Sequence, residues 1–227
     1  MITWIAGWPH NGSTLLRQIL KDAFGINTVS SYPEPKLDSL LGEGTNEFAE
    51  RWCRERLAAF LFCLGDSATW YIKTHDIPID NQKAIFLVRD GRDTVTALSQ
   101  YWHLPIAAAI TGQRCMFGGW SEFYWVWDPK NRPDTLLVRF EDMVQKPEGV
   151  IYELERFLNR PSTGKWIDKY AEDSKHYPQL FNGRVGIWKK GMSDDDLDLF
   201  WKCHGGVMKE LGYGVKGPER QVIAPGE

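Results

Sequence analysis

The feature that most constrains the fold is the segment of residues 2–20, where a short apolar run is followed by a glycine-containing loop and a helical pattern. We expect a buried strand that starts at Ile2, and a helix that begins near Ser13 and ends near Phe24. At such a strand-to-helix turn the backbone N–H groups are unpaired, and the helix dipole adds partial positive charge where they converge. The segment therefore predicts an anion site, although an ordinary α/β connection without a ligand gives the same pattern.

The loop glycines have the spacing of a phosphate-binding motif but lack one of its residues. Gly7 and Gly12, followed by Ser13 and Thr14, nearly match the G-x-x-x-x-G-K-[ST] loop of nucleotide triphosphatases. Ser13 stands at the position of the lysine that reaches the β- and γ-phosphates in that motif. The spacing therefore favours a phosphate group and argues against a nucleoside triphosphate.

Composition bounds the class of protein. A chain of 227 residues with 43% hydrophobic residues is long enough for one domain, which we expect at residues 1–212, with residues 213–227 as a loose tail. The formal net charge of −3 gives no general attraction to nucleic acid or membrane, and no apolar stretch approaches the roughly 20 residues of a membrane span. The four cysteines form no C-x-x-C pair, which argues against a metal site and favours reduced thiols in the cytoplasm. The sequence does not indicate an oligomeric state.

Strand-like and helix-like segments alternate along the chain. Strands are expected at residues 69–74, 83–88 and 135–140, and helices at residues 46–64, 93–102, 141–158 with a break at Pro147, and from Ser193 to near Gly212. Residues 25–45 and 183–189 are expected to be loops, and most aromatic residues of 120–127 to pack in the core. Such alternation implies right-handed βαβ crossovers. We therefore predict an α/β fold whose central parallel sheet is covered by helices on both faces.

Polar clusters follow two of the expected strands at their carboxyl ends, where open α/β sheets bind ligands. The first cluster is Lys73-Thr74-His75 and the second runs from Arg89 to Asp93. His75 is the candidate general base because the pKa of an imidazole lies near neutral pH, and Lys73 is expected to stabilise developing negative charge. A histidine bonded to the backbone and a solvated lysine are the alternative interpretations of these two residues.

Six segments together resemble the sulfotransferases that use 3′-phosphoadenosine 5′-phosphosulfate (PAPS), and they occur in the order found in that family. In chain order they are Pro9–Thr14, Lys73–His75, Arg89–Asp93, Gly118–Trp120 with Trp127, Phe140–Met143 and Gly183–Lys189. The resemblance implies a three-layer α/β/α fold with a central parallel sheet, of the P-loop-like sulfotransferase type. It implies transfer of a sulfuryl group from PAPS to a hydroxyl or amine of a small acceptor, with 3′-phosphoadenosine 5′-phosphate (PAP) as product and no metal.

The resemblance also assigns roles to residues. It implies His75, Lys73 and His10 as catalytic residues. The family's cofactor contacts fall on three groups of positions: the loop with Pro9, His10, Asn11, Gly12, Ser13 and Thr14 at the 5′ side, Arg89, Gly183, Arg184 and Lys189 at the 3′-phosphate, and Ser174 near the adenine. A family serine falls on Ala97, which leaves Thr96 or Ser99 as its substitute.

Departures from the family pattern keep other functions open. His10 replaces the loop lysine of the family, so it would act on the leaving phosphate only when protonated. A small-metabolite kinase is one alternative. A kinase needs a lysine where this chain has Ser13, and a magnesium-binding aspartate at the end of a buried strand, where this chain has Arg89 before Asp90. A nucleotide-binding module without catalysis is the other, since His10, Ala97 and Phe181 all differ from the family. Aromatic residues in the loops at 25–45 and 103–127 hint at an apolar or aromatic acceptor.

Overall fold

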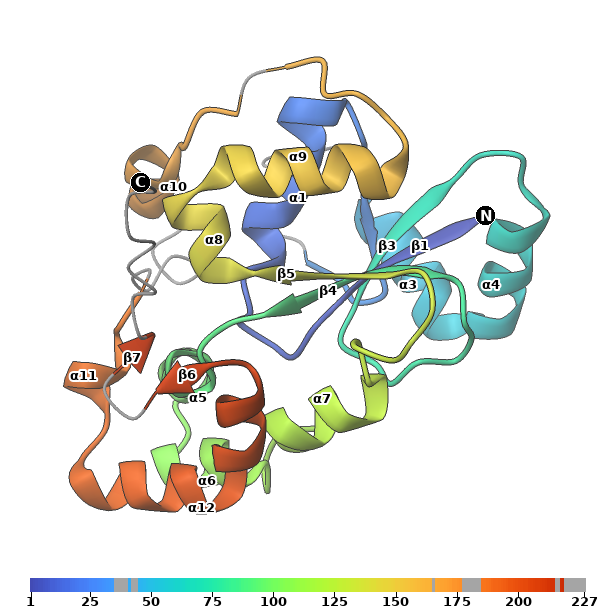
Figure 1. Ribbon diagram of the computed structural model, residues 1–227. Helices are drawn as coiled ribbons and strands as arrows, with labels where there is room; N and C mark the ends of the chain where they lie inside the picture. Colours follow the sequence, from blue (N-terminus) through green and yellow to red (C-terminus); the bar gives the residue numbers. More distant parts are fainter. Residues whose placement is uncertain (35–40, 42–44, 165, 177–184, 215–216, 219–227) are drawn as a thin grey trace, which may run out of the picture.

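The computed structural model describes residues 1–34, 41, 45–164, 166–176, 185–214 and 217–218. Its centre is a five-stranded parallel sheet in the order β2-β3-β1-β4-β5 (Figure 1). The strands are β1 (Ile2–Ala6), β2 (Val29–Ser30), β3 (Trp70–Thr74), β4 (Lys83–Val88) and β5 (Thr135–Arg139). The predicted α/β fold with a central parallel sheet is confirmed.

One face of the sheet is covered by three helices, α1 (Ser13–Phe24), α8 (Phe140–Gln145) and α9 (Pro147–Leu158), seen above the sheet in Figure 1. Side chains alternate across a strand, so Ile5, Ile85 and Leu87 point to this face and pack against the apolar side of α1 and α9. Pro147 begins α9, where a missing N–H costs nothing. The predicted break within 141–158 is therefore confirmed.

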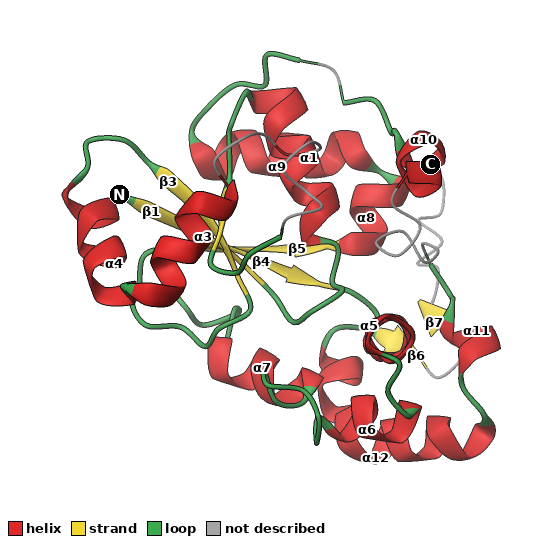
Figure 2. Ribbon diagram, turned by 180° about the vertical axis from the view of Figure 1, so that it is seen from behind, coloured by secondary structure: helices red, strands yellow, loops and turns green. Residues whose placement is uncertain are grey.

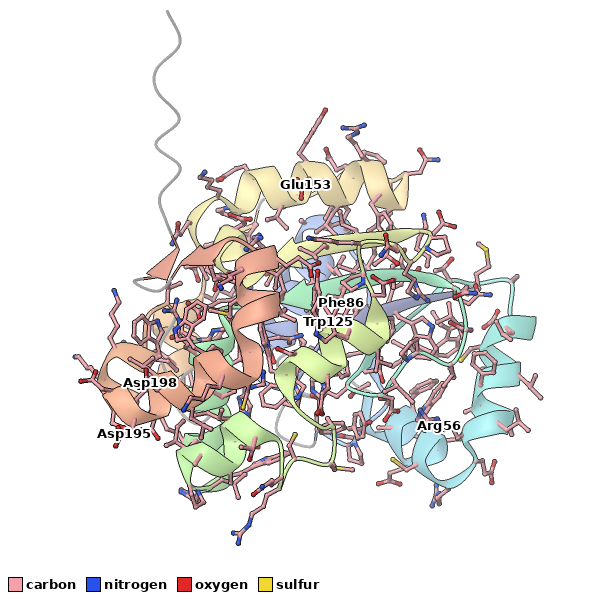
Figure 3. The ribbon with its side chains drawn as sticks, turned by 60° about the horizontal axis from the view of Figure 1, so that its bottom comes forward. Arg56, Phe86, Trp125, Glu153, Asp195 and Asp198 are labelled. Atoms are coloured by element: carbon pink, nitrogen blue, oxygen red, sulfur yellow. The ribbon has the colours of Figure 1, made fainter. Side chains whose placement is uncertain are left out.

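The other face is covered by a larger set of helices and carries the main aromatic core. Trp4 and Phe86 lie in this core, and Figure 3 labels Phe86 next to Trp125. The helices are α3 (Thr45–Arg54), α4 (Arg56–Gly65), α5 (Gly91–Trp102), α6 (Ile106–Thr111), α7 (Trp120–Trp127) and α12 (Asp194–Glu210). Figure 2 shows this layer from behind, so the three-layer arrangement is visible from both sides.

Two short helices and a small hairpin complete the described chain. They are α10 (Tyr170–His176), α11 (Trp188–Gly191), β6 (Tyr213–Gly214) and β7 (Gly217–Pro218), the last two paired antiparallel. Tyr213, the first residue after the expected domain boundary at 212, is buried in the core. Within the described ranges, no helix has both the length and the apolar character needed to cross a bilayer.

Three expectations about local structure were wrong. The loop expected at 25–45 contains the edge strand β2, which is too short to give a periodic signal. The single helix expected at 46–64 is interrupted at Glu55, whose φ of −135° lies outside the helical region, so α3 and α4 are separate. Lys189 was expected in a loop but lies in the short helix α11.

Candidate active site

The loop between β1 and α1 is shaped by a buried side chain and two glycines. Asn11 donates from Nδ2 to the Leu87 carbonyl oxygen at 3.3 Å, and its Oδ1 accepts from the Ser13 N–H at 3.2 Å. A Cβ on Gly7 would lie 1.5 Å from Asn11 Nδ2, and one on Gly12 would lie 2.3 Å from a ring carbon of Phe140. Gly12 also has a φ of +97°, which other residues rarely adopt. Asn11 therefore connects the loop to β4 and to the start of α1.

The amino end of α1 suits an anion. The capping residue is Gly12, which has no side chain to bond to the first turn, and that turn contains no acidic residue. The predicted phosphate donors run from Asn11 to Thr14, but the Ser13 N–H already has the Asn11 oxygen as acceptor. Ser13 and Thr14 are partly exposed and Pro9 is buried. The remaining first-turn N–H groups and the two hydroxyls are therefore the groups that could bind an anion at this end of α1.

His75 lies at the carboxyl end of β3, directly against the loop. Its Nδ1 is 2.6 Å from the Gly7 carbonyl oxygen, and because a carbonyl only accepts, Nδ1 carries the hydrogen. The lone pair is then on Nε2. Burial, with the positive charge of Lys73, lowers the pKa of His75 well below its ordinary value. The backbone-bonded histidine and the general base are thus compatible, because this bond sets the tautomer that accepts a proton.

Two aromatic rings flank the His75 imidazole. The Tyr32 ring stacks on it at 5.9 Å between centroids, and the Phe117 ring meets it edge-on at 5.4 Å. Tyr32 is held in turn by its hydroxyl, which donates to Asp76, and this bond and burial raise the pKa of Tyr32. The proton-accepting side of the site therefore has apolar walls.

Lys73 is buried, with 4% of its surface exposed, which excludes the solvated interpretation. Its ammonium is 3.0 Å from Glu34 Oε1, and Arg17 Nη1 is 2.5 Å from Glu34 Oε2. Burial alone would raise the pKa of Glu34, but Lys73 and Arg17 together lower it to about 2. Sequence reasoning missed Glu34 because it lies in an aperiodic stretch between two prolines.

His10 is held in an unusual backbone conformation beside Arg89. Its φ is +62°, its carbonyl oxygen accepts from Arg89 Nη1 at 3.1 Å, and its ring lies 5.0 Å from that of Tyr101. Burial and the positive charges of Arg89 and Lys73 lower the pKa of His10 to about 3. In the unliganded protein the imidazole is therefore neutral at pH 7, and the predicted acid role requires a bound anion that raises this pKa.

Arg89 follows β4 and lies between the loop and α5. Its guanidinium stacks over Phe140 at 4.5 Å and is 4.0 Å from Asp93 Oδ2. The same Asp93 carboxylate accepts from the backbone N–H groups of Gly186 and Trp188, just before Lys189. Arg89 and the Lys189 segment are thus brought to the same end of α5. Sequence reasoning named Asp93 only as part of the polar run, although its place one turn after Arg89 was the available signal.

The structure places the remaining predicted cofactor residues in three different ways. Thr96 is buried, and its Oγ1 has no hydrogen-bond partner in the part of the chain that the structure describes. Ser99 donates to the Leu104 carbonyl oxygen at 2.7 Å, so Thr96 is the better substitute for the family serine. Ser174 lies on α10, which is tied to α1 by a bond from Gln18 to Asp173. Gly183 and Arg184 lie outside the described residues.

Neither a nearby hollow nor a metal site in the described part of the chain adds to the predicted catalytic residues. A shallow surface hollow lies beside the end of β3, but none of the predicted catalytic residues lines it; its lining is Trp4, Arg56, Thr74, Asp76, Ile77, Pro78, Ile79 and Trp127. Among the described residues, no group of three or more His, Cys, Asp or Glu side chains is arranged to hold a metal ion.

Comparison with known proteins supports a sulfotransferase family. The model of the sulfotransferase domain matches residues 69–178. A WSCD family member of Aedes aegypti is 27% identical over 180 residues, which cover 70% of this chain and 51% of that protein. Mouse sulfotransferase 4A1 is 23% identical, with 88% of this chain and 78% of that protein covered.

A solved structure agrees with this sulfotransferase fold. Mouse sulfotransferase SULT7A1, crystallised with PAP, superposes with a TM-score of 0.58 at 17% identity, covering 93% of this chain and 88% of the other. The chain spans about half the length of this mosquito relative. The matched range contains Lys73, His75, Arg89 and Ser174, whereas the β1–α1 loop and Lys189 lie outside it.

Proposed function

We propose that this sulfotransferase uses PAPS as donor and transfers the sulfuryl group to a hydroxyl or amine of a small acceptor. The observation that carries the proposal is the bond from His75 Nδ1 to the Gly7 carbonyl oxygen. It links the candidate base to the anion-binding loop and leaves Nε2 as the proton acceptor. The imidazole is neutral at pH 7, as a general base must be, but burial and Lys73 lower its pKa well below the ordinary value and so weaken it as a base.

The residues present fit the donor. The α1 amino end without an acidic residue suits the 5′-phosphosulfate, and Arg89 suits the 3′-phosphate because a guanidinium forms two parallel bonds to such a group. PAPS supplies an activated sulfuryl group with the 5′-phosphate of PAP as leaving group. His75 Nε2 takes the acceptor proton while the acceptor oxygen or nitrogen bonds to sulfur. The electron pair of the breaking S–O bond goes to the phosphate, where Lys73 stabilises the charge.

The rings of Tyr32 and Phe117 favour an acceptor with an apolar or aromatic body. They flank the His75 imidazole at 5.9 and 5.4 Å, so an acceptor hydroxyl that reaches Nε2 would lie against them. Aromatic walls of this kind bind planar apolar groups through area and edge-to-face contacts. Free thiols at all four cysteines support a cytoplasmic location for such an enzyme.

A nucleotide-binding module without catalysis is the second candidate. Its support is electrostatic: the pKa of His10 is lowered to about 3, and Glu34 neutralises Lys73, so two of the three predicted catalytic groups are uncharged or paired. A module of this kind would bind PAP and show no turnover with any acceptor.

The donor is tested by calorimetric measurement of PAP binding, with ATP and magnesium as control. Catalysis is tested by transfer of labelled sulfate from PAPS to a panel of phenols, alcohols and amines. We expect tight PAP binding, little response to ATP, and turnover with at least one aromatic acceptor. PAP binding without any turnover would favour the module. A preference for ATP would overturn the proposal in favour of a kinase.

A further inference from the structure

A buried carboxylate on α5 ties a distant segment to the proposed donor site. Asp93 has 0% of its side chain exposed and lies in the first turn of α5. Its Oδ2 accepts from the Gly186 N–H at 2.7 Å and its Oδ1 accepts from the Trp188 N–H at 3.0 Å. Bonds from backbone N–H groups to an ionised carboxylate are about twice as strong as bonds between neutral groups. Asp93 thus holds the turn at 186–188 from a position 93 residues away in sequence.

The same carboxylate faces the arginine proposed for the 3′-phosphate. Asp93 Oδ2 lies 4.0 Å from Arg89 Nη2, and Lys189 follows the turn that Asp93 holds. Arg89 is also bonded to the His10 carbonyl oxygen and stacked on Phe140, so its position does not depend on Asp93 alone. The turn at 186–188 depends on Asp93 more strongly than Arg89 does.

Two neighbouring contacts dock α11 along the same side of α5. Arg92, bonded through Nε and Nη2 to Asp90, stacks over the Trp188 ring at 4.1 Å. Gly191 packs so closely on α5 that an added Cβ would lie 2.5 Å from Thr96 Cγ2. These contacts fix where α11 lies, and the two Asp93 bonds fix how the backbone enters it.

We propose that Asp93 is a positioning residue for the 3′-phosphate, which holds the turn at 186–188 so that Lys189 and Arg89 reach the same group. This inference rests on the proposed function, because the 3′-phosphate belongs to the donor. Loss of the carboxylate releases one or both N–H groups of the turn and separates the two cations. The binding advantage that the 3′-phosphate gives is then reduced, while contacts at the 5′ side stay intact.

The test compares two nucleotides that differ in the 3′-phosphate, PAP and adenosine 5′-monophosphate. The ratio of their dissociation constants is measured by calorimetry for the wild type, for Asp93→Asn, and for the control Asp198→Asn on the exposed surface of α12 (Figure 3). We expect Asp93→Asn to reduce the ratio about 10-fold with the monophosphate affinity unchanged, and the control to leave both unchanged. Amide hydrogen exchange at Gly186 and Trp188 should become faster in Asp93→Asn alone.

The outcomes separate this inference from the function on which it rests. A wild type that binds PAP no more tightly than the monophosphate would overturn the proposed function. A wild-type advantage that Asp93→Asn retains would overturn the role of Asp93, and so would an equal loss of both nucleotides in a folded variant. If Asp93→Asn does not fold, Gly186→Ala strains the same turn, because Gly186 has a φ of +83°, and an unchanged ratio there would also overturn it.

Discussion

Two imidazoles lie beside the β1–α1 loop, and burial first and then nearby positive charge lower the pKa of both. His75 also has a tautomer fixed by the Gly7 carbonyl oxygen, whereas His10 faces Arg89 as well as Lys73. A bound polyanion opposes these cations, and it acts more strongly on His10 because Arg89 lies beside that residue. The two residues are therefore suited to opposite directions of proton transfer, His75 as base and His10 as an acid formed on binding.

Removal of the His75 imidazole should abolish turnover without weakening nucleotide binding. We expect His75→Ala to lower kcat about 100-fold or more, because an acceptor hydroxyl then has no base. PAP affinity, measured by calorimetry, should stay within about twofold. Tyr101→Phe serves as the control, since it changes a ring near the loop but no proton acceptor at His75. A His75→Ala variant with an unchanged rate would remove His75 from the mechanism.

The pKa of His10 should rise when PAP binds. It is about 3 in the unliganded protein, so the imidazole NMR shifts of His10 should not titrate between pH 5 and pH 9. With PAP bound, the phosphates oppose Arg89 and Lys73, and we expect the pKa to rise into this pH range, so that His10 titrates there. His10→Lys should flatten any alkaline limb in the rate profile, because lysine keeps its charge to about pH 10. A His10 that stays neutral in the PAP complex has no role as leaving-group acid.

Glu34 should stabilise the fold through its two buried partners. Its pKa is lowered from 4.5 to about 2, so its contribution is complete above about pH 4.5 and is lost as the pH falls towards 2. We expect Glu34→Gln to reduce the free energy of unfolding by about 3 kcal/mol at pH 7, and by much less near pH 2. Urea unfolding at several pH values measures this.

A matched control for Glu34 is Glu50→Gln, which breaks an exposed pair with Arg54 at 3.9 Å. We expect that change to cost less than about 1 kcal/mol at every pH. Equal effects of the two substitutions at pH 7 would mean that the cluster of Glu34, Lys73 and Arg17 contributes no more than a surface ion pair.

At the scale of elements, the conformation of the β1–α1 loop depends on a glycine that packs directly against α8. Gly12 has a φ of +97° and no space for a Cβ, which would lie 2.3 Å from the Phe140 ring. We expect Gly12→Ala to destabilise the fold by about 2 kcal/mol or more and to abolish measurable PAP binding. Gly25→Ala is the matched control, because Gly25 also has a positive φ but no neighbour within 4 Å of the added atom. That control should cost only about 1 kcal/mol and keep PAP affinity.

The elements that were predictable from sequence are those with a complete local signal. The strand β4 is apolar throughout, and α12 has Ser193 as its cap with Asp196 bonding back to it, so both were located from residue types alone. The strand β2 is two residues long and exists only because β3 offers an edge, and no local pattern encodes that. The break at Glu55 likewise follows from packing, since no proline or glycine marks it.

At the scale of the whole molecule, parallel strands made part of the site predictable. Lys73 lies at the carboxyl end of β3, and His75 and Arg89 follow β3 and β4 directly. These two strands flank β1 on either side, so the meeting of the three residues at one edge follows from the topology. The role of Glu34, and the bonds of Asp93 to the turn at 186–188, were not predictable, because these partners lie far apart in sequence: Lys73 for Glu34, and the turn for Asp93. A pattern within one segment carries no information about such pairs.

The carboxyl end of the described chain is coupled to the site through a second buried carboxylate. Tyr213, which follows the expected domain boundary, donates to Glu141 Oε2 at 2.9 Å, and Glu141 Oε1 accepts from the Asp90 N–H at 2.9 Å, next to Arg89. Burial raises the pKa of Glu141, and these two donors oppose that increase. Removal of the Tyr213 hydroxyl therefore leaves a buried carboxylate with one donor fewer at the start of α5.

We expect Tyr213→Phe to lower the free energy of unfolding by about 1–2 kcal/mol at pH 7. Because protonated Glu141 needs one donor fewer, the deficit should shrink as the pH falls through the raised pKa of Glu141. Urea unfolding across pH measures this, and Tyr152→Phe, whose side chain is 59% exposed, should change stability by less than about 0.5 kcal/mol. PAP affinity should fall with Tyr213→Phe, since Asp90 caps the helix that carries Asp93. Equal stability of the two variants would show that the residues after 212 do not support the site.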